Sequence, residues 1–206
     1  MSSTEGAAVW LVRHGEARNP AGVLYGRLPR LGLSPLGQQQ AQAVAKFLEP
    51  RPLAAIYSSP MLRARKTAAA ILACHPEIDR VRLDRDLVEI RTGWQGEPLA
   101  TLEKINWDFY AHPRSPEDES IEMIHARMQR WLRRVLRRHT GREVVGVSHG
   151  DPILILVAGL RGLPLERQRI FANPYIEPAT VFRLRFESAA SRPEVQQFVP
   201  HAEAAA

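Results

Sequence analysis

The sequence contains very little cysteine. Cys74 is the single one among 206 residues, so the chain cannot form an internal disulfide. It lies in the alanine-rich stretch AAAILACHP, which has helical character, and we expect it to be a small buried apolar residue. A chain without disulfides is typical of a reducing compartment.

Long apolar segments are missing as well. No run approaches the ~18 residues that a membrane-spanning helix needs. The N-terminal stretch MSSTEGAAVWLVRHG has neither the basic start nor the long apolar centre of a signal peptide. We therefore expect a soluble, cytoplasmic protein that does not bind membranes.

Two kinds of ligand motif are also absent. The chain has neither Gly-x-Gly-x-x-Gly nor Gly-Lys-Ser/Thr, the loops that bind nucleotide phosphates. His149 and Asp151 can be interpreted as a pair of metal ligands, but no further His/Asp cluster accompanies them. The histidines outside the motifs described below share no spacing: His75, His112, His125, His139 and His201. We expect no metal site.

The charged residues are unbalanced towards basic, with 28 Lys and Arg against 22 Asp and Glu and a net charge of +6. Such a balance suits an anionic partner. The densest basic run, RMQRWLRRVLRRHTGRE, separates on a helical wheel into an apolar and a basic face. The apolar face holds Ile121, Ile124, Met128, Trp131 and Val135, and the opposite face holds Arg130, Arg133 and Arg137. We expect a solvated outer face there and no nucleic-acid partner.

Strand-like and helix-like segments alternate along the chain, which predicts an α/β fold with a mainly parallel central sheet. The expected strands are 7–12, 54–59, a segment beginning at Val81, 143–148, 179–186 and 194–199. The expected helices are 34–48, 61–73, 119–140 and 152–160. Because no linker or repeat interrupts this pattern, we expect a single domain over residues 1–206.

The segment at about 92–118 is the least regular part of the chain. Its aromatic residues, Trp94, Trp107, Phe109 and Tyr110, lie among glycines and prolines. We expect a short, partly helical insertion in the domain. Two interpretations stay open, a lid over a substrate and a small satellite core.

Two of the predicted strands end alike, on Arg13-His14-Gly15 and on Ser148-His149-Gly150. Ligands of open α/β sheets bind beyond the carboxyl ends of the strands, so both histidines project to the place where sites form. Arg63 and Arg65 follow the strand at 54–59. The segment VRLDRDLVEI offers three acids, Asp84, Asp86 and Glu89. Glu89 stands nearest its C-terminal end and is best placed to reach the site.

Two histidines, arginines and one carboxylate suit phosphoryl transfer through a covalent phosphohistidine. A neutral imidazole is a good nucleophile near pH 7, because its pKa of about 6.5 leaves a lone pair free. We expect His14 to attack phosphorus while Arg13, Arg63 and a protonated His149 hold the phosphoryl oxygens. Glu89 would give the leaving alkoxide its proton, and would later deprotonate the attacking water.

Four ordered motifs, LVRHGEARN, SSPMLRARKTA, LVEIRTGWQG and VVGVSHG, resemble the histidine phosphatase superfamily in its phosphoglycerate-mutase-like branch. The resemblance covers residues 9–160. It implies a three-layer sandwich with helices on both faces of the sheet, and an enzyme that needs no metal or other cofactor. It implies His14 as the phosphorylated nucleophile, Arg13, Arg63 and His149 as the phosphate pocket, and Glu89 as the proton donor.

The same resemblance implies further substrate contacts near these residues. Asn19 is a phosphate or substrate contact by this comparison, although in many members the asparagine stands one residue later. Tyr25-Gly26 stands where many phosphatases have Gln-Gly. Trp94-Gln95-Gly96 stands where Trp-Glu-Gly is usual. Gly150, directly after His149, completes the expected substrate-binding set.

Three functions are compatible with these residues. The first is a phosphatase that hydrolyses a small phosphorylated metabolite. The second is a mutase, which must return the phosphoryl group to a bound acceptor; the mutases resembled here carry a longer insertion between the motifs of Glu89 and His149, so hydrolysis is favoured. The third, a non-catalytic anion-binding module, would lack the nucleophile or a pocket arginine, and this chain has both.

Overall fold

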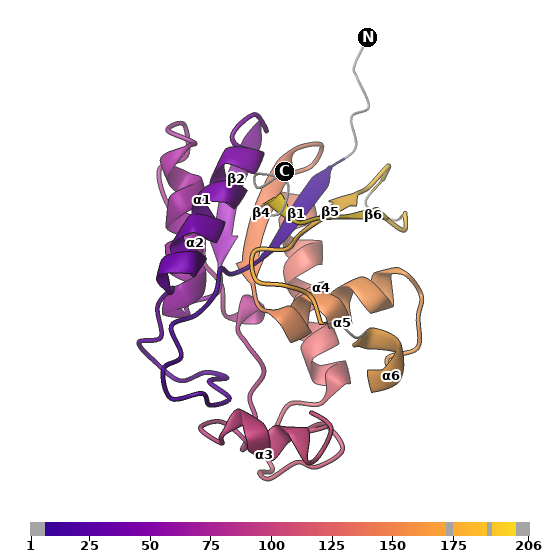
Figure 1. Ribbon diagram of the computed structural model, residues 1–206. Helices are drawn as coiled ribbons and strands as arrows, with labels where there is room; N and C mark the ends of the chain where they lie inside the picture. Colours follow the sequence, from indigo (N-terminus) through magenta and orange to yellow (C-terminus); the bar gives the residue numbers. More distant parts are fainter. Residues whose placement is uncertain (1–6, 172–174, 189–190, 201–206) are drawn as a thin grey trace.

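The computed structural model describes residues 7–171, 175–188 and 191–200. Its sheet has the order β3-β2-β4-β1-β5-β6 (Figure 1). The strands are β1 (Ala8–Arg13), β2 (Leu53–Ser58), β3 (Val81–Leu83), β4 (Glu143–Ser148), β5 (Val181–Arg185) and β6 (Glu194–Phe198). Strands β1 to β4 pair in parallel, while β5 and β6 add an antiparallel edge. The sheet is therefore mainly parallel, as expected.

Helices cover both faces of this sheet, which confirms the three-layer sandwich (Figure 1). One face carries α1 (Pro35–Leu48) and α2 (Leu62–Ala73), and the other carries α4 (Ile121–Arg138) and α5 (Gly150–Leu160). Shorter helices are η1 (Arg85–Leu87), α3 (Leu99–Glu103) and α6 (Arg167–Ile170).

Strand β1 is buried on both faces, which explains why it is an unbroken apolar run. Trp10 and Val12 point into the core under α1 and α2, while Val9 and Leu11 point into the core under α4 and α5. Parallel strands with helices on both sides need apolar residues at successive positions. The unbroken apolar run in the sequence therefore indicates a central strand.

Helix termini follow the expected capping chemistry. Ser34 accepts a hydrogen bond from the Gly37 amide at 2.9 Å, and Pro35 occupies the first turn of α1. Ser120 caps α4 in the same way. The predicted faces of α4 are confirmed, because Trp131 is fully buried and Arg133 is exposed.

Four details differ from the expectations. Strand β3 ends at Leu83, because the Asp84 side chain accepts a bond from the Asp86 amide and starts η1 instead. Helix α5 begins at Gly150, two residues earlier than predicted. Helix α6 was not predicted. Cys74 is half-buried at the end of α2 rather than fully buried.

Residues 92–118 fold around α3 at one end of the molecule (Figure 1). Trp94 is buried there, donates a hydrogen bond from Nε1 to the His112 carbonyl at 2.7 Å, and lies under the Arg114 guanidinium. Phe109 and Tyr110 instead pack against the core between the sheet and α4. The segment is therefore held together internally around Trp94, and it contacts the rest of the protein through Phe109 and Tyr110.

Candidate active site

The ends of β1 and β4 place the two histidines side by side. Arg13 is paired with Ser148 in the parallel register, and the His14 amide donates to the Ser148 carbonyl at 3.1 Å. His14 and His149 follow directly, and their ring centroids are 5.0 Å apart. The structure therefore brings the two motifs together at one edge of the sheet, as expected.

Close approach of the chain explains the glycine of the first motif. A Cβ on Gly15 would lie 2.3 Å from the Gly37 carbonyl oxygen of α1. A backbone atom cannot move aside as a flexible side chain can, so any larger residue would push the loop away from α1. The Gly15 amide also donates to Thr67 Oγ1 of α2 at 3.1 Å. The loop that carries His14 is therefore held between two helices.

Arg63, at the start of α2, joins the two rings. It is fully buried, and its Nε donates to His14 Nε2 at 3.0 Å. Its Nη2 donates to His149 Nδ1 at 3.1 Å and to the Gly26 carbonyl at 2.8 Å. Its Nη1 is buried and has no hydrogen-bond partner among the described residues. A buried guanidinium with a free donor in such a place suits an anion.

The hydrogen bonds of His14 define its tautomer. Its Nδ1 lies 2.7 Å from the Gly15 carbonyl oxygen, which can only accept, so Nδ1 carries the proton. The lone pair is then on Nε2, the atom that faces Arg63. Burial lowers the pKa of His14 well below 6.5, and the positive charges of Arg63 and Arg13 lower it further. His14 is thus a neutral imidazole at pH 7 with its unprotonated nitrogen next to Arg63.

His149 is neutral in this arrangement too, which corrects the expectation of a protonated ring. Burial lowers its pKa well below 6.5, and Arg63 and His14 add to the effect. Nδ1 accepts from Arg63, so Nε2 donates to Ser59 Oγ at 2.8 Å. The positive charge beside His14 therefore comes from arginine.

Arg13 lies on the side of the site formed by the segment after α6. Its guanidinium covers the Tyr175 ring at 5.0 Å and donates from Nη1 to the Ile176 carbonyl. Its Nε is buried without a hydrogen-bond partner within the described ranges. Its charge contributes to the pKa shifts of both His14 and His149.

Glu89 is the acid that reaches the histidines. Its Oε2 lies 3.5 Å from His149 Nδ1 and 3.9 Å from Arg63 Nη2. Burial raises its pKa to about 7, Asp151 adds to the rise, and Arg63 opposes it. The other two acids of the segment, Asp84 and Asp86, instead form ion pairs with Arg134 of α4. Arg65 is exposed on α2, so the choice of Glu89 and Arg63 agrees with the geometry.

Asp151 is the site residue that sequence reasoning missed. Its carboxylate accepts hydrogen bonds from Tyr110 Oη at 2.7 Å and from Tyr175 Oη. Burial raises its pKa, and the two tyrosine hydroxyls oppose that rise. Its position two residues after His149 is the available signal, but the sequence alone does not show that two tyrosines from distant segments bind it. A Cβ on Gly150 would lie 2.0 Å from Tyr175 Oη, so a larger residue there would displace the Tyr175 side chain.

The expected substrate contacts divide into two groups. Tyr25 lies under the Arg63 guanidinium at 4.6 Å, and the Gly26 carbonyl accepts a hydrogen bond from Arg63, so both contact a central residue of the candidate site. The Asn19 side chain exchanges two hydrogen bonds with the backbone of Val23, at 2.9 and 3.3 Å, and closes its own loop.

One group among the described residues has the spacing of a metal site, formed by His14, Glu89 and His149. Arg63 donates to a ring nitrogen of each histidine, which places its positive charge directly against the cluster. Two guanidinium groups next to the cluster also oppose a cation. The donor set suits an anion better than a metal ion.

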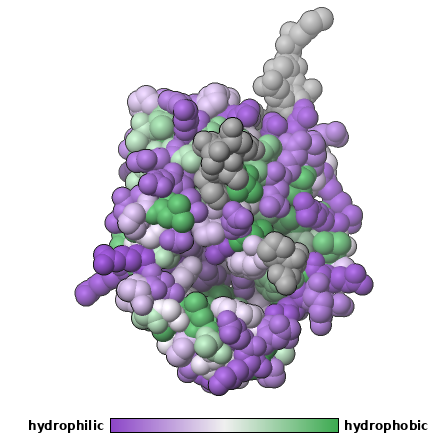
Figure 2. All heavy atoms as spheres, viewed as in Figure 1, coloured by the Kyte–Doolittle hydropathy of each residue, from purple (hydrophilic) through white to green (hydrophobic). Residues whose placement is uncertain are grey.

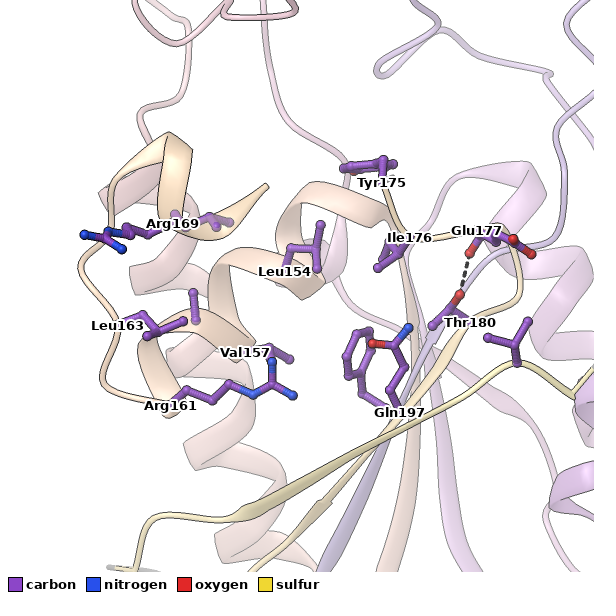
Figure 3. A pocket seen from close by; sticks show the side chains of 14 residues that line it. Leu154, Val157, Arg161, Leu163, Arg169, Tyr175, Ile176, Glu177, Thr180 and Gln197 are labelled. Atoms are coloured by element: carbon purple, nitrogen blue, oxygen red, sulfur yellow. Dashed lines mark hydrogen bonds between the residues drawn. The ribbon is translucent and has the colours of Figure 1, made fainter. Parts of the chain in front are cut away.

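A separate cavity of about 340 Å³ lies behind Tyr175 and Ile176. Figure 3 shows Leu154 and Val157 of α5 on one side of it and Gln197 of β6 on the other. Neither histidine of the candidate site lines it. The candidate site and this cavity are therefore distinct, and the 175–176 segment lies between them.

Comparison with known proteins decides the family. A family model described as the histidine phosphatase superfamily (branch 1) matches residues 9–197. The chain belongs to the histidine phosphatase superfamily. This confirms the resemblance found in the four motifs.

Named members of the superfamily are similar over most of the chain. Phosphoserine phosphatase 1 of Hydrogenobacter thermophilus is 33% identical over 166 residues, which are 76% of this chain and 77% of that protein. Phosphoglycerate mutase-like protein 4 of Arabidopsis thaliana is 34% identical over 189 residues, 86% of this chain and 80% of that protein. The solved structure of a mycobacterial glucosyl-3-phosphoglycerate phosphatase covers 93% of this chain and 97% of its own, with a TM-score of 0.76 and 26% identity. The expected class, a hydrolase of the histidine phosphatase type, agrees with these relatives.

Proposed function

We propose that this protein hydrolyses a small phosphomonoester through a covalent phosphohistidine on His14. One observation carries the proposal: the unprotonated Nε2 of His14 faces a buried guanidinium that has a free N–H donor. A phosphoryl group bound to that donor would have its phosphorus within reach of Nε2. The related phosphatases support hydrolysis as the reaction.

The first step transfers the phosphoryl group to the enzyme. Nε2 of His14 forms a bond to phosphorus while the bond from phosphorus to the substrate oxygen breaks. Glu89 gives its proton to that leaving oxygen, and its pKa of about 7 leaves it partly protonated at neutral pH. In the second step Glu89, now a carboxylate, removes a proton from water, the water oxygen attacks phosphorus, and His14 is released with inorganic phosphate.

The remaining residues would bind the phosphoryl group and its alcohol. Arg13 and Arg63 supply the charged donors, and His149 supports Arg63. Tyr25, Gly26 and Gly150 would form the walls of the pocket. Asn19 would reach a substrate only by exchanging its bonds with Val23 for new ones.

The insertion at 92–118 would act as a lid of the one domain formed by residues 1–206. It contacts the site through Tyr110, which binds Asp151. The pocket suits small phosphorylated metabolites. The names of the relatives supply two examples, phosphoserine and glucosyl-3-phosphoglycerate, without choosing between them.

The test is phosphate release by His14→Ala over a panel of phosphorylated metabolites. We expect a loss of at least about 10³-fold, because no other side chain is placed to form the intermediate. His112→Ala, which removes an exposed histidine, is the matched control and should retain full activity. Phosphate release by His14→Ala at the rate of the unaltered enzyme would refute the proposal.

A second measurement separates hydrolysis from mutase activity. Phosphoglycerate isomerisation is followed in parallel with phosphate release by the unaltered enzyme. We expect phosphate release to dominate. Isomerisation faster than release would replace the phosphatase with a mutase that uses the same first step.

A further inference from the structure

Arg127 of α4 is buried, although the other arginines named on the basic side of this helix face solvent. Its exposed fraction is 6%, whereas Arg130, Arg133 and Arg137 of the same helix are exposed. Burying a guanidinium is costly unless it is paired and its donors are used. The proposed mechanism gives Arg127 no role. Its hydrogen-bond partners therefore indicate which part of the structure the buried guanidinium stabilises.

Arg127 binds Glu119 and two carbonyls of the segment that carries Glu89. Its Nε and Nη2 bind the two carboxylate oxygens of Glu119 at 3.0 and 3.2 Å. Its Nη1 donates to the Asp86 carbonyl at 2.7 Å, and Nη2 also donates to the Glu89 carbonyl at 3.4 Å. One buried guanidinium therefore holds both ends of the 86–89 segment.

Arg27 approaches the same carbonyl from another part of the chain. Its Nε donates to the Glu89 carbonyl at 2.7 Å, and its Nη2 donates to Glu119 Oε2 at 2.8 Å. Arg27 directly follows Gly26, whose carbonyl binds Arg63. Two arginines thus share one carboxylate and converge on one backbone oxygen.

The Glu89 backbone needs this support because residues 88–90 belong to no helix or strand. Hydrogen bonds of regular structure do not hold it. The carbonyl is bound by the two arginines while the carboxyl group of the same residue faces His149 at 3.5 Å. Fixing the carbonyl limits where the carboxyl group can lie.

We propose that Arg27, Glu119 and Arg127 form a clamp that positions the Glu89 carboxyl group for proton transfer to the leaving oxygen. We call these three residues the Glu89 clamp. They are positioning residues, since they act through Glu89. The inference rests on the proposed function, in which Glu89 is the proton donor.

A purely structural ion pair would make a different prediction. It would change the free energy of unfolding, and any effect on turnover would be alike for all substrates. A positioning role makes the effect depend on the leaving group. An alkyl phosphate needs a proton on its leaving oxygen, whereas p-nitrophenyl phosphate releases a stable anion and needs it much less.

The main variant is Glu119→Gln, which keeps the shape of the side chain and removes the charge that both arginines share. We expect kcat/KM, which reports phosphoryl transfer to the enzyme, to fall about 10- to 100-fold for an alkyl phosphate and to change less than about threefold for p-nitrophenyl phosphate. The matched control is Glu117→Gln, because Glu117 pairs with Arg91 at 2.9 Å on the surface. The control should leave both substrates unaffected.

Arg27→Lys keeps the positive charge near Glu119 but loses the Nε donor to the Glu89 carbonyl. Arg27 is partly exposed, so this variant should fold, and its thermal unfolding is measured beside its kinetics. We expect the same selective loss with the alkyl phosphate. Equal losses for both substrates, or no loss for either, in Glu119→Gln and Arg27→Lys would overturn the clamp.

Glu89→Gln separates failure of the clamp from failure of the proposed function. If Glu89→Gln slows the alkyl phosphate selectively and the clamp variants do not, the clamp alone is wrong. If Glu89→Gln lowers kcat/KM equally for both substrates, Glu89 is not the proton donor, and the clamp fails together with that part of the proposed function, while the phosphohistidine is tested separately by His14→Ala.

Discussion

At the residue scale, burial moves the pKa values of His14 and Glu89 in the directions that the proposed mechanism needs. It lowers the pKa of His14, because a buried imidazolium loses its hydration and lies beside Arg63. It raises the pKa of Glu89 to about 7, because a buried carboxylate loses hydration too. A neutral base and a protonated acid therefore coexist near pH 7.

These shifts predict the pH profile of kcat/KM for an alkyl phosphate. In the proposed mechanism protonated Glu89 is the active form, so kcat/KM should fall as pH rises through about 7, by about tenfold per pH unit well above it. Because the pKa of His14 lies well below 6.5, its protonation should cause no loss near pH 6.5.

Glu89→Gln is the control for this profile. The variant should have low activity without the decline above pH 7, since the titrating acid is gone. A wild-type profile that stays flat from pH 6 to pH 9 would contradict the pKa of about 7 for Glu89.

At the element scale, three segments distant in sequence meet at the first turn of α5. Tyr110 from the insertion and Tyr175 from the segment after α6 both donate to Asp151. Phe171 stacks on Tyr110 with centroids 5.8 Å apart and extends the contact. The insertion is thus fastened to the body beside the histidines by one carboxylate and a small group of aromatic rings.

Tyr110→Phe should loosen the insertion without altering the sheet. The variant keeps the ring contacts and loses a hydrogen bond with a net contribution of about 1 kcal/mol. Amide hydrogen exchange in residues 92–118 should become roughly fivefold faster, while exchange in β1 and α1 stays the same.

Tyr57→Phe is the matched control, since it removes a hydroxyl that lies 3.0 Å from His139 Nε2, between β2 and the end of α4. It should leave exchange in the insertion unchanged. Unchanged exchange in Tyr110→Phe would show that the bond to Asp151 does not hold the insertion.

At the scale of the whole molecule, charge is distributed to favour anions. The net charge is +6, and the face in Figure 2 is mostly hydrophilic, with a hollow above the insertion at the bottom of the view. Helix α4 keeps its basic side outward, although Asp84 and Asp86 neutralise part of it. Among the described residues no helix combines the length and apolar character needed to cross a membrane.

The net charge predicts how salt acts on catalysis. For a dianionic phosphomonoester, kcat/KM should fall roughly three- to tenfold between about 0.02 M and about 0.3 M NaCl, because screening weakens long-range attraction. The turnover number at saturating substrate should change little, since the buried groups of the site are screened much less. A kcat/KM that does not depend on salt would show that the overall charge has no part in substrate capture.

The sequence by itself determined the order of the main strands and helices and the mainly parallel sheet, and it selected His14, Arg63, His149 and Glu89 as candidate site residues. Those features depend on short patterns, such as apolar periodicity and motifs at strand ends, that do not require knowledge of the packing. The neutral state of His149 follows instead from its burial beside Arg63. The place of Asp151 and the burial of Arg127 depend on partners more than 20 residues away. Only the tertiary structure decides them, because desolvation and charge pairing depend on which distant groups the fold brings together.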